Sequence, residues 1–177
     1  LAHELEPVGQ VAVVNLATAK VEKRLTVGTR PVAVVKRPQG DFALVASMFS
    51  PWAAVIDLKQ LEVVGRVKVG HYAMDFTFSA DGAVLFATSR MNDEVQRWKV
   101  TVKGGTLEAA QTHAAPAGIN PMPLALSPDG ARLFVGDQGG LTVRVYEAAT
   151  LAPVKELFLN APIFDLKPMG GFIVTTT

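Results

Sequence analysis

Short hydrophobic runs alternate with polar turns along the whole chain. The runs are rich in Val, Ile and Phe, as in residues 42–46 and 95–100, and the turns between them carry Gly, Pro and Asp. No segment of the sequence keeps an apolar stripe at helical spacing over three turns. The pattern therefore predicts an all-β chain of short strands.

The pattern is also periodic. Residues 11–18 (VAVVNLAT) are similar to residues 53–60 (AAVIDLKQ), and both segments lead to a Val-Gly pair, at Gly28 and Gly70. These glycines are 42 residues apart, which is the spacing of a repeat protein rather than of a single irregular domain.

The third repeat is longer than the others. Gly118 follows Gly70 by 48 residues, and we expect the additional residues in loops around 103–105 and 114–117. Turn glycines mark every repeat, because glycine adopts the positive φ that tight turns require. They are Gly40, Gly82, Gly130 and Gly170.

Each repeat is predicted to contain four strands, A to D. Strand A is expected at 32–35, 74–78, 122–126 and 163–166, and strand B at 42–46, 84–88, 132–135 and 172–175. Strand C is expected at 11–15, 54–57, 95–100 and 142–146, and strand D at 21–27, 63–69, 107–111 and 154–159.

Four-stranded units at this period predict a β-propeller, in which each antiparallel unit is one blade. The chain holds about four blades' worth of strands, as three whole blades and two half-blades. The predicted units are 1–28 (half-blade), 29–70, 71–118, 119–160 and 161–177 (half-blade). Three assemblies follow: a self-closed four-bladed ring, an eight-bladed ring of two chains, or part of a longer polypeptide. Boundaries that cut inside a blade favour a fragment or partial ring.

Several motifs resemble the YVTN-type 40-residue repeat, a family of β-propellers in surface-layer and periplasmic proteins. The matching segments are GTRP at 28–31, AVID at 54–57, SPDG at 127–130 and RLFV at 132–135. The resemblance covers nearly the whole chain and implies the fold rather than an activity. The chain departs from the family signature after strand B, where it has LVAS, FATS and FVGD.

Two further propeller families share shorter motifs. WKV at 98–100, GGTL at 104–107 and Asn120-Pro121 are similar to the seven-bladed sugar-lactonase pattern. Residues 46–57 and GHYA at 70–73 are similar to stretches of the cytochrome d1-type propeller, which implies haem as a cofactor. In that family a His ligates haem where this chain has Asp75, so no cofactor is predicted.

Composition narrows the function classes. The formal net charge is +1, so no overall field attracts nucleic acid, and no apolar stretch is long and unbroken enough for membrane insertion. The chain has no cysteine, which excludes disulfides, thiolate nucleophiles and Cys-ligated metals. Together with the YVTN resemblance, the missing cysteine predicts a periplasmic or extracellular location.

In a propeller, the loop leading into strand A and the loop between strands B and C lie on one face around the axis. Function in repeat folds concentrates on such a face. We therefore predict a ligand or partner face. Its candidate residues are Arg30, Met48, Phe49, Trp52, His71, Tyr72, Asp75, Arg90, Asn92, Asn120, Asp137 and Gln138. The simpler interpretation is that these are ordinary loop residues, with Phe49 and Trp52 packed between blades.

The candidates for chemistry are few. His71 is the only histidine on the predicted face, and a lone histidine is more often a hydrogen-bonding loop residue than a ligand. Asp75 and Asp165 are expected on or beside inner strands, where they either bind a polar ligand or accept backbone N–H groups. No metal site is predicted, and no catalytic motif of the hydrolase, metalloprotease or nucleotide-binding types occurs.

The sequence thus favours a non-catalytic binding or scaffold module for a protein or small-molecule partner. A second chain or a missing segment would complete the ring. The alternative is a propeller enzyme, either a sugar-lactonase-like hydrolase or a haem- or quinone-linked periplasmic oxidoreductase.

Overall fold

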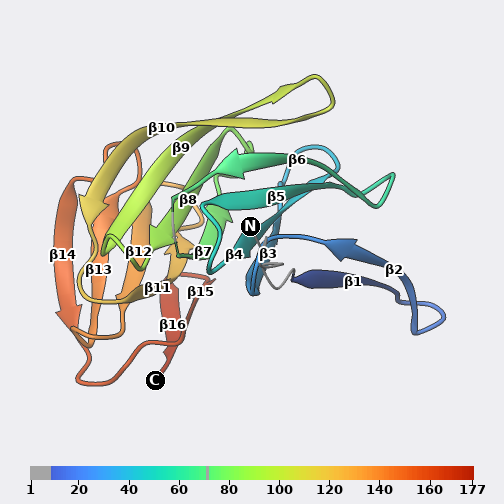
Figure 1. The fold of residues 1–177 in the computed structure, drawn as a ribbon. Coiled ribbons are helices and arrows are strands. Elements are labelled where there is room, and N and C mark those ends of the chain that lie inside the picture. Colours follow the sequence, from blue (N-terminus) through green and yellow to red (C-terminus); the bar gives the residue numbers. More distant parts are fainter. Residues whose placement is uncertain (1–8, 71) are drawn as a thin grey trace, which may run out of the picture.

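The computed structural model describes residues 9–70 and 72–177. All the regular secondary structure in these residues consists of β-strands (Figure 1). Sixteen strands follow one another along the chain. They are β1 (Gln10–Asn15), β2 (Lys20–Thr26), β3 (Pro31–Lys36), β4 (Phe42–Ser47), β5 (Trp52–Asp57), β6 (Glu62–Lys68), β7 (Ala73–Phe78), β8 (Val84–Ser89), β9 (Glu94–Lys103), β10 (Thr106–Pro116), β11 (Pro121–Leu126), β12 (Arg132–Asp137), β13 (Thr142–Glu147), β14 (Pro153–Phe158), β15 (Asp165–Met169) and β16 (Phe172–Thr176).

The strands form three four-stranded sheets and two hairpins, all antiparallel and all in chain order. The four-stranded sheets are β3–β6, β7–β10 and β11–β14, and the hairpins are β1–β2 and β15–β16. This arrangement confirms the predicted fold class, a β-propeller with three whole blades and two half-blades. The unit boundaries given above stay a prediction.

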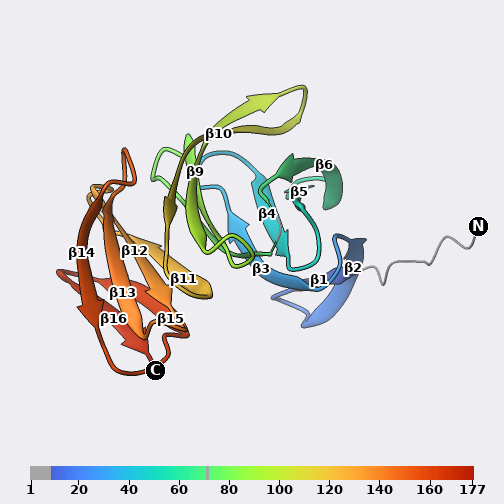
Figure 2. The ribbon, with the colours of Figure 1, turned by 60° about the vertical axis from the view of Figure 1, so that its left-hand side comes forward.

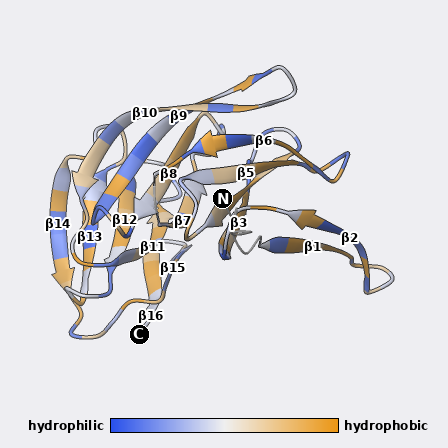
Figure 3. Cartoon of the chain, in the orientation of Figure 1, coloured by the Kyte–Doolittle hydropathy of each residue, from blue (hydrophilic) through white to orange (hydrophobic). Residues whose placement is uncertain are grey.

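Burial explains why the hydrophobic runs form central strands. β4, β5 and β8 are buried on both faces because each lies within a sheet that is packed between two other sheets. β1 and β3 instead alternate between exposed and partly buried residues. Figure 3 shows hydrophilic and hydrophobic bands alternating along β9, where one face packs inward and the other meets solvent.

The core lies between neighbouring sheets rather than inside any one of them. Leu44 and Val55 of the first sheet pack with Phe76 and Leu85 of the second. A second cluster joins the second and third sheets and includes Val95 and Leu133. Each sheet is therefore stabilised by the sheets beside it, as in other repeat architectures.

The inner strands run side by side around the axis. β7 contacts β3 on one side and β11 on the other, and β11 also contacts β15. Figure 2 shows the β1–β2 and β15–β16 hairpins at opposite ends of this row. The hairpins belong to separate sheets, so a four-bladed ring closed by pairing of the half-blades does not describe this structure.

Two sequence expectations about elements were wrong. The last inner strand begins at Asp165, not at residue 163, and Ile163 is instead a fully buried residue ahead of it. The additional residues of the third repeat do not form loops, because most of them lengthen β9 and β10 into a long hairpin with a Gly104-Gly105 turn. Within the described residues, no helix is long and apolar enough to cross a membrane.

Candidate functional site

The loops that lead into the inner strands are hydrogen-bonded to the loops that follow the second strands of the same sheets. This contact recurs in all three four-stranded sheets, so both sets of loops lie on one face, here called the loop face. The bonds run from Met48 N to Arg30 O (3.0 Å), from Arg90 N to Tyr72 O (3.0 Å) and from Gln138 N to Asn120 O (3.4 Å).

The acceptor residue in each of these bonds has an unusual backbone. Arg30, Tyr72 and Asn120 have φ values of 54°, 55° and 57°, in the left-handed region. Asn tolerates this region, whereas Arg and Tyr adopt it at a cost of about 1–2 kcal/mol each. The surrounding hydrogen bonds hold these residues in place, and the same strained position in successive repeats gives the loops a defined shape.

An aromatic cluster joins the first two sheets. The Phe49 and Tyr72 rings meet edge to face with centroids 5.1 Å apart, and the Arg30 guanidinium lies 5.8 Å from the centre of the Phe49 ring. Such ring and cation–π contacts are each worth about 0.5–1.5 kcal/mol. Arg30 and Phe49 are exposed, so they remain available to a partner while the contacts restrain them.

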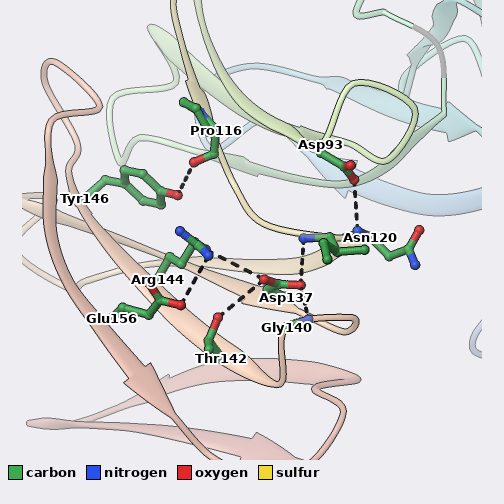
Figure 4. A network of polar contacts seen from close by, with 10 residues as sticks. Asp93, Pro116, Asn120, Asp137, Gly140, Thr142, Arg144, Tyr146 and Glu156 are labelled. Carbon is green, nitrogen blue, oxygen red and sulfur yellow. Dashed lines mark hydrogen bonds and ion pairs between the residues drawn. The ribbon is translucent and has the colours of Figure 1, made fainter.

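A polar link joins the second and third sheets. Arg90 donates its Nε–H to the Asn120 side-chain oxygen at 2.9 Å, and the Asn120 backbone N–H binds Asp93 Oδ1 at 3.0 Å. Asn120 therefore bonds to the neighbouring loop through both its side chain and its backbone. Figure 4 shows the backbone bond to Asp93. Asp93 was not among the residues predicted from the sequence. The one available signal was its position directly after Asn92, on the same predicted loop.

The sequence predicted Asp137 on the exposed loop face, but its side chain is buried in the structure. Its Oδ1 accepts N–H groups from Ile119 (2.9 Å) and Gly140 (2.8 Å), and its Oδ2 lies 3.4 Å from the Thr142 hydroxyl and 3.7 Å from Arg144 Nε (Figure 4). Because it is buried and accepts the N–H groups of two loops, this carboxylate positions these loops and does not face solvent. Met48 is likewise buried.

The exposed part of the loop face is apolar and cationic. Phe49, Met91 and Ile119 are 45%, 63% and 58% exposed, and Phe49 and Met91 occupy equivalent places in successive loops. Asn92 is exposed beside Met91, and Gln138 is half-buried. Met91 and Ile119 were not among the predicted face residues, because Met and Ile usually fill cores. His71 lies outside the described residues.

Trp52 lies at the edge of the loop face. It is exposed at the start of β5, and its backbone N–H binds the Ser50 hydroxyl at 3.2 Å. Together with Arg66 and Thr29 it lines a recess of about 180 Å³ between the β1–β2 hairpin and the first sheet. It therefore does not pack in the core between blades.

Asp75 lies on β7, below the loops, where β7 borders the axis. Its two carboxylate oxygens accept the N–H groups of Phe76 (2.8 Å) and Leu124 (3.1 Å), the second on the next inner strand. Burial raises the pKa of Asp75 above its ordinary value despite these bonds. Both oxygens are engaged, so Asp75 does not fit as a haem ligand.

The described residues contain no group of three or more His, Asp or Glu side chains that could hold a metal ion. Arg30, Arg90 and Asp93 are charged side chains of the loop face, and Arg90 and Asp93 both bond to Asn120. These groups can orient an anionic or polar partner, and they include no evident nucleophile.

Sheets in a row around an axis, with loops of successive sheets on one face, define a β-propeller. Residues 53–152, more than half of the chain, match the family model described as Lactonase, 7-bladed beta-propeller. The chain belongs to this family. The lactonase resemblance seen in the sequence is thus confirmed, while the YVTN assignment stays a prediction. No curated protein matches the chain.

Solved structures support the fold. The chain is similar to Kuenenia stuttgartiensis hydrazine synthase, with a TM-score of 0.75 and 21% identity over 89% of this chain and 46% of that one. It is also similar to the Myceliophteria thermophila Cps50 (Swd1) β-propeller domain, with a TM-score of 0.75 and 14% identity over 94% and 59% of the two chains. A third likeness is to a chain of the Mitotic Checkpoint Complex, with a TM-score of 0.74 and 15% identity over 95% and 51%. The chain spans about half the length of these structures.

Proposed function

We propose that the chain is a binding module and that its loop face holds a protein partner. The observation that carries this proposal is the exposure of Phe49, Met91 and Ile119 on loops that are hydrogen-bonded in place. Aromatic residues, Met and Arg are enriched at the centres of protein interfaces, and loops that are already ordered lose little entropy on binding. One structural relative comes from a multiprotein complex, which agrees with this use of the fold.

Small molecules are the less favoured ligands of this face. Its apolar side chains stand on loops rather than around an enclosed cavity, whereas small-molecule sites are concave. The recess beside Trp52 is the exception, and its volume of about 180 Å³ admits only a small ligand.

The test compares two surface variants as immobilised baits in extracts of the source organism. Replacing Phe49 and Met91 by Ser should abolish capture of a specific protein. A control variant with Gln39→Ala and Lys59→Ala, on turns at the other ends of the strands, should retain it. Circular dichroism and thermal unfolding verify that both variants fold. Equal capture by both variants would overturn the proposal.

Lactone hydrolysis is the second candidate, because the family match spans the loop around Arg90 and Asn120. In this case the Arg90 guanidinium would stabilise the negative charge that develops on the carbonyl oxygen of a lactone substrate. Hydrolysis of glucono-δ-lactone releases acid and is measured by the base needed to hold the pH constant. Hydrolysis by the native chain that is abolished in Arg90→Ala and His71→Ala would favour the enzyme over the binding module. No hydrolysis by the native chain would remove this candidate.

We also propose a periplasmic or extracellular location, which the absence of cysteine supports. Fractionation of cells that express the complete protein tests it. Recovery in the cytosolic fraction alone would contradict it.

A further inference from the structure

The third sheet places a carboxylate beside a glycine of the loop face. Asp137, the last residue of β12, accepts the Ile119 N–H at 2.9 Å, and its Oδ2 lies 1.8 Å from the position of a Cβ on Gly118. Arg144 Nε lies 3.7 Å from the same Oδ2, and Arg144 also donates to Glu156 at 3.2 Å (Figure 4). A carboxylate and a guanidinium of one sheet thus fill the space beside the glycine.

The place of this guanidinium differs among the three four-stranded sheets. In the third sheet, Arg144 is the third residue of β13 and stands opposite Glu156 of β14. In the first sheet, the third residue of β5 is Ala54, which stands opposite Arg66 of β6. In the second sheet, the third residue of β9 is Gln96, which is buried. The first of these sheets therefore has a small side chain where the others have a long polar one.

The recess beside Trp52 lies at this place in the first sheet. Gly28 and Thr29, which follow β2, line it together with Ala54 and Arg66 of the outer strands. Its volume of about 180 Å³ is space that the small Ala54 side chain leaves open. Among the described residues, none from β1 lines the recess, so it does not depend on the free edge of the β1–β2 hairpin.

Donors around this recess lack acceptors among residues 9–70 and 72–177. Ser47, the last residue of β4, is 1% exposed, and its hydroxyl has no hydrogen-bond partner. This hydroxyl lies 2.8 Å from the position of a Cβ on Gly28, at the wall of the recess. The Thr29 N–H follows the glycine, as the N–H bound by the third sheet's carboxylate does, but it has no acceptor. Arg66 forms no ion pair or hydrogen bond. Buried polar groups are nearly always hydrogen-bonded, so these donors indicate a missing acceptor.

We propose that the recess binds an organic carboxylate, whose charged group takes the place that the Asp137 carboxylate fills in the third sheet. The bound carboxylate accepts the Ser47 hydroxyl and the Thr29 N–H, and the Arg66 guanidinium balances its charge. The apolar part of the ligand packs against Trp52, which lines the recess and is 41% exposed. Because the third sheet holds a carboxylate at the equivalent N–H group, the recess should select this group over a neutral one.

The carboxylate belongs either to a free small molecule or to an acidic side chain of a protein partner, and the chemistry of recognition is the same for both. The inference does not depend on the binding function proposed above. Capture of a partner through Phe49 and Met91 and binding in the recess involve different residues, so different substitutions abolish them.

The first experiment titrates the full chain with benzoate by isothermal titration calorimetry. Benzoate is a suitable probe because a cavity of about 150 Å³ already accommodates a benzene ring. We expect a dissociation constant of about 1 mM or lower. Benzyl alcohol, which has the ring without the charge, should bind at least about tenfold more weakly. Inorganic phosphate should also bind more weakly than benzoate, which separates a carboxylate site from general attraction of anions.

Three substitutions connect the binding to the recess. Arg66→Gln removes the charge and should raise the benzoate dissociation constant about tenfold or more. Ser47→Ala removes a donor that has no partner in the free chain, so it should weaken binding without lowering thermal stability. Ala54→Gln introduces the side chain of the second sheet and should fill the recess and abolish binding. Lys99→Gln, an exposed cation on β9, is the matched control and should leave the constant unchanged. Thermal unfolding verifies that each variant folds.

A native chain that does not bind benzoate overturns the proposal. Binding that Arg66→Gln and Ala54→Gln leave unchanged overturns it as well, and so does phosphate or benzyl alcohol that binds as tightly as benzoate. A short blocked peptide with one Glu separates the two sources of the carboxylate. Tighter binding of the peptide than of benzoate would support an acidic side chain of a protein partner, and the reverse order would support a free small molecule.

Discussion

The Asp137 carboxylate accepts the backbone N–H of Ile119 at 2.9 Å, and this bond ties the end of β12 to the loop that leads into β11. Asp137 is fully buried, and its second loop contact, to Gly140 N, holds the turn that follows β12. One buried side chain thus sets the shape of both loops that the third sheet contributes to the loop face.

Gly118 should be intolerant of a side chain because it stands next to this carboxylate. A Cβ at residue 118 would overlap Asp137 Oδ2, and the φ of 86° adds a conformational cost of about 1–2 kcal/mol. Gly130 has a similar φ of 72° but nothing near its Cβ position. We expect Gly118→Ala to destabilise the chain by at least about 1 kcal/mol more than Gly130→Ala in urea unfolding. Equal losses of stability in the two variants would show that the Asp137 carboxylate can move away from a side chain at residue 118.

Removing the carboxylate itself should be more costly. Asp137→Ala leaves the buried N–H groups of Ile119 and Gly140 without their acceptor, and we expect a loss of about 1–3 kcal/mol for each of them. The Arg144 guanidinium loses the neighbouring carboxylate but keeps its ion pair with Glu156. Glu62→Ala breaks an exposed ion pair with Lys23 and should cost less than about 1 kcal/mol. Chemical denaturation of both variants measures the contrast, and similar losses would assign Asp137 a minor role.

The repeat period predicted the fold because each unit carries the same hydrophobic runs and turn glycines. The turns also behave as the residues indicate. In the SPDG turn, the Ser127 hydroxyl accepts the Arg132 N–H and Asp129 accepts the Ala131 N–H, a local arrangement that the sequence alone specifies.

The loop face was only partly predictable. Arg30, Phe49, Tyr72, Arg90 and Asn120 lie together because equivalent positions of successive repeats share a face. The burial of Asp137 could not be inferred, since Ser47 and Ser89 occupy its place in the other sheets and their short side chains give no hint of a carboxylate network. The exposure of Met91 depends on loop conformation, which the hydrophobic pattern does not encode.

The pH dependence of stability should report the burial of Asp75. Burial raises its pKa in the folded chain above the ordinary 3.8, so the folded state binds the proton more tightly than the unfolded state. The contribution of this group is therefore fully present below the unfolded pKa and declines as pH rises through the folded pKa. We expect the stability difference between the native chain and Asp75→Asn to fall as the pH rises above 3.8, the ordinary pKa of the carboxyl group. A difference that grows with pH would contradict the direction of the shift.

Tyr146 should make the stability of the fold depend on pH in the alkaline range as well. Its hydroxyl donates to Pro116 O at 2.6 Å, which links β13 to the end of β10, and burial raises its pKa from 10.0 to about 12. The folded state retains the phenol proton after the unfolded state has lost it. The stabilising contribution is therefore present below pH 10.0 and is lost as pH rises toward about 12.

Two variants separate this effect from other alkaline changes. Tyr146→Phe should lose about 0.5–1.5 kcal/mol at neutral pH and should lack the additional decline that the native chain shows between pH 10.0 and about 12. Tyr72→Phe leaves Tyr146 as the only tyrosine, so phenolate absorbance then reports its titration directly. A phenolate that forms at the ordinary pKa in the folded Tyr72→Phe variant would mean that Tyr146 is not buried against Pro116. The second and third sheets would then be linked by the remaining polar bonds and by the apolar contacts around Leu133. These polar bonds involve Asp75, Thr88, Arg90, Asp93 and Asn120.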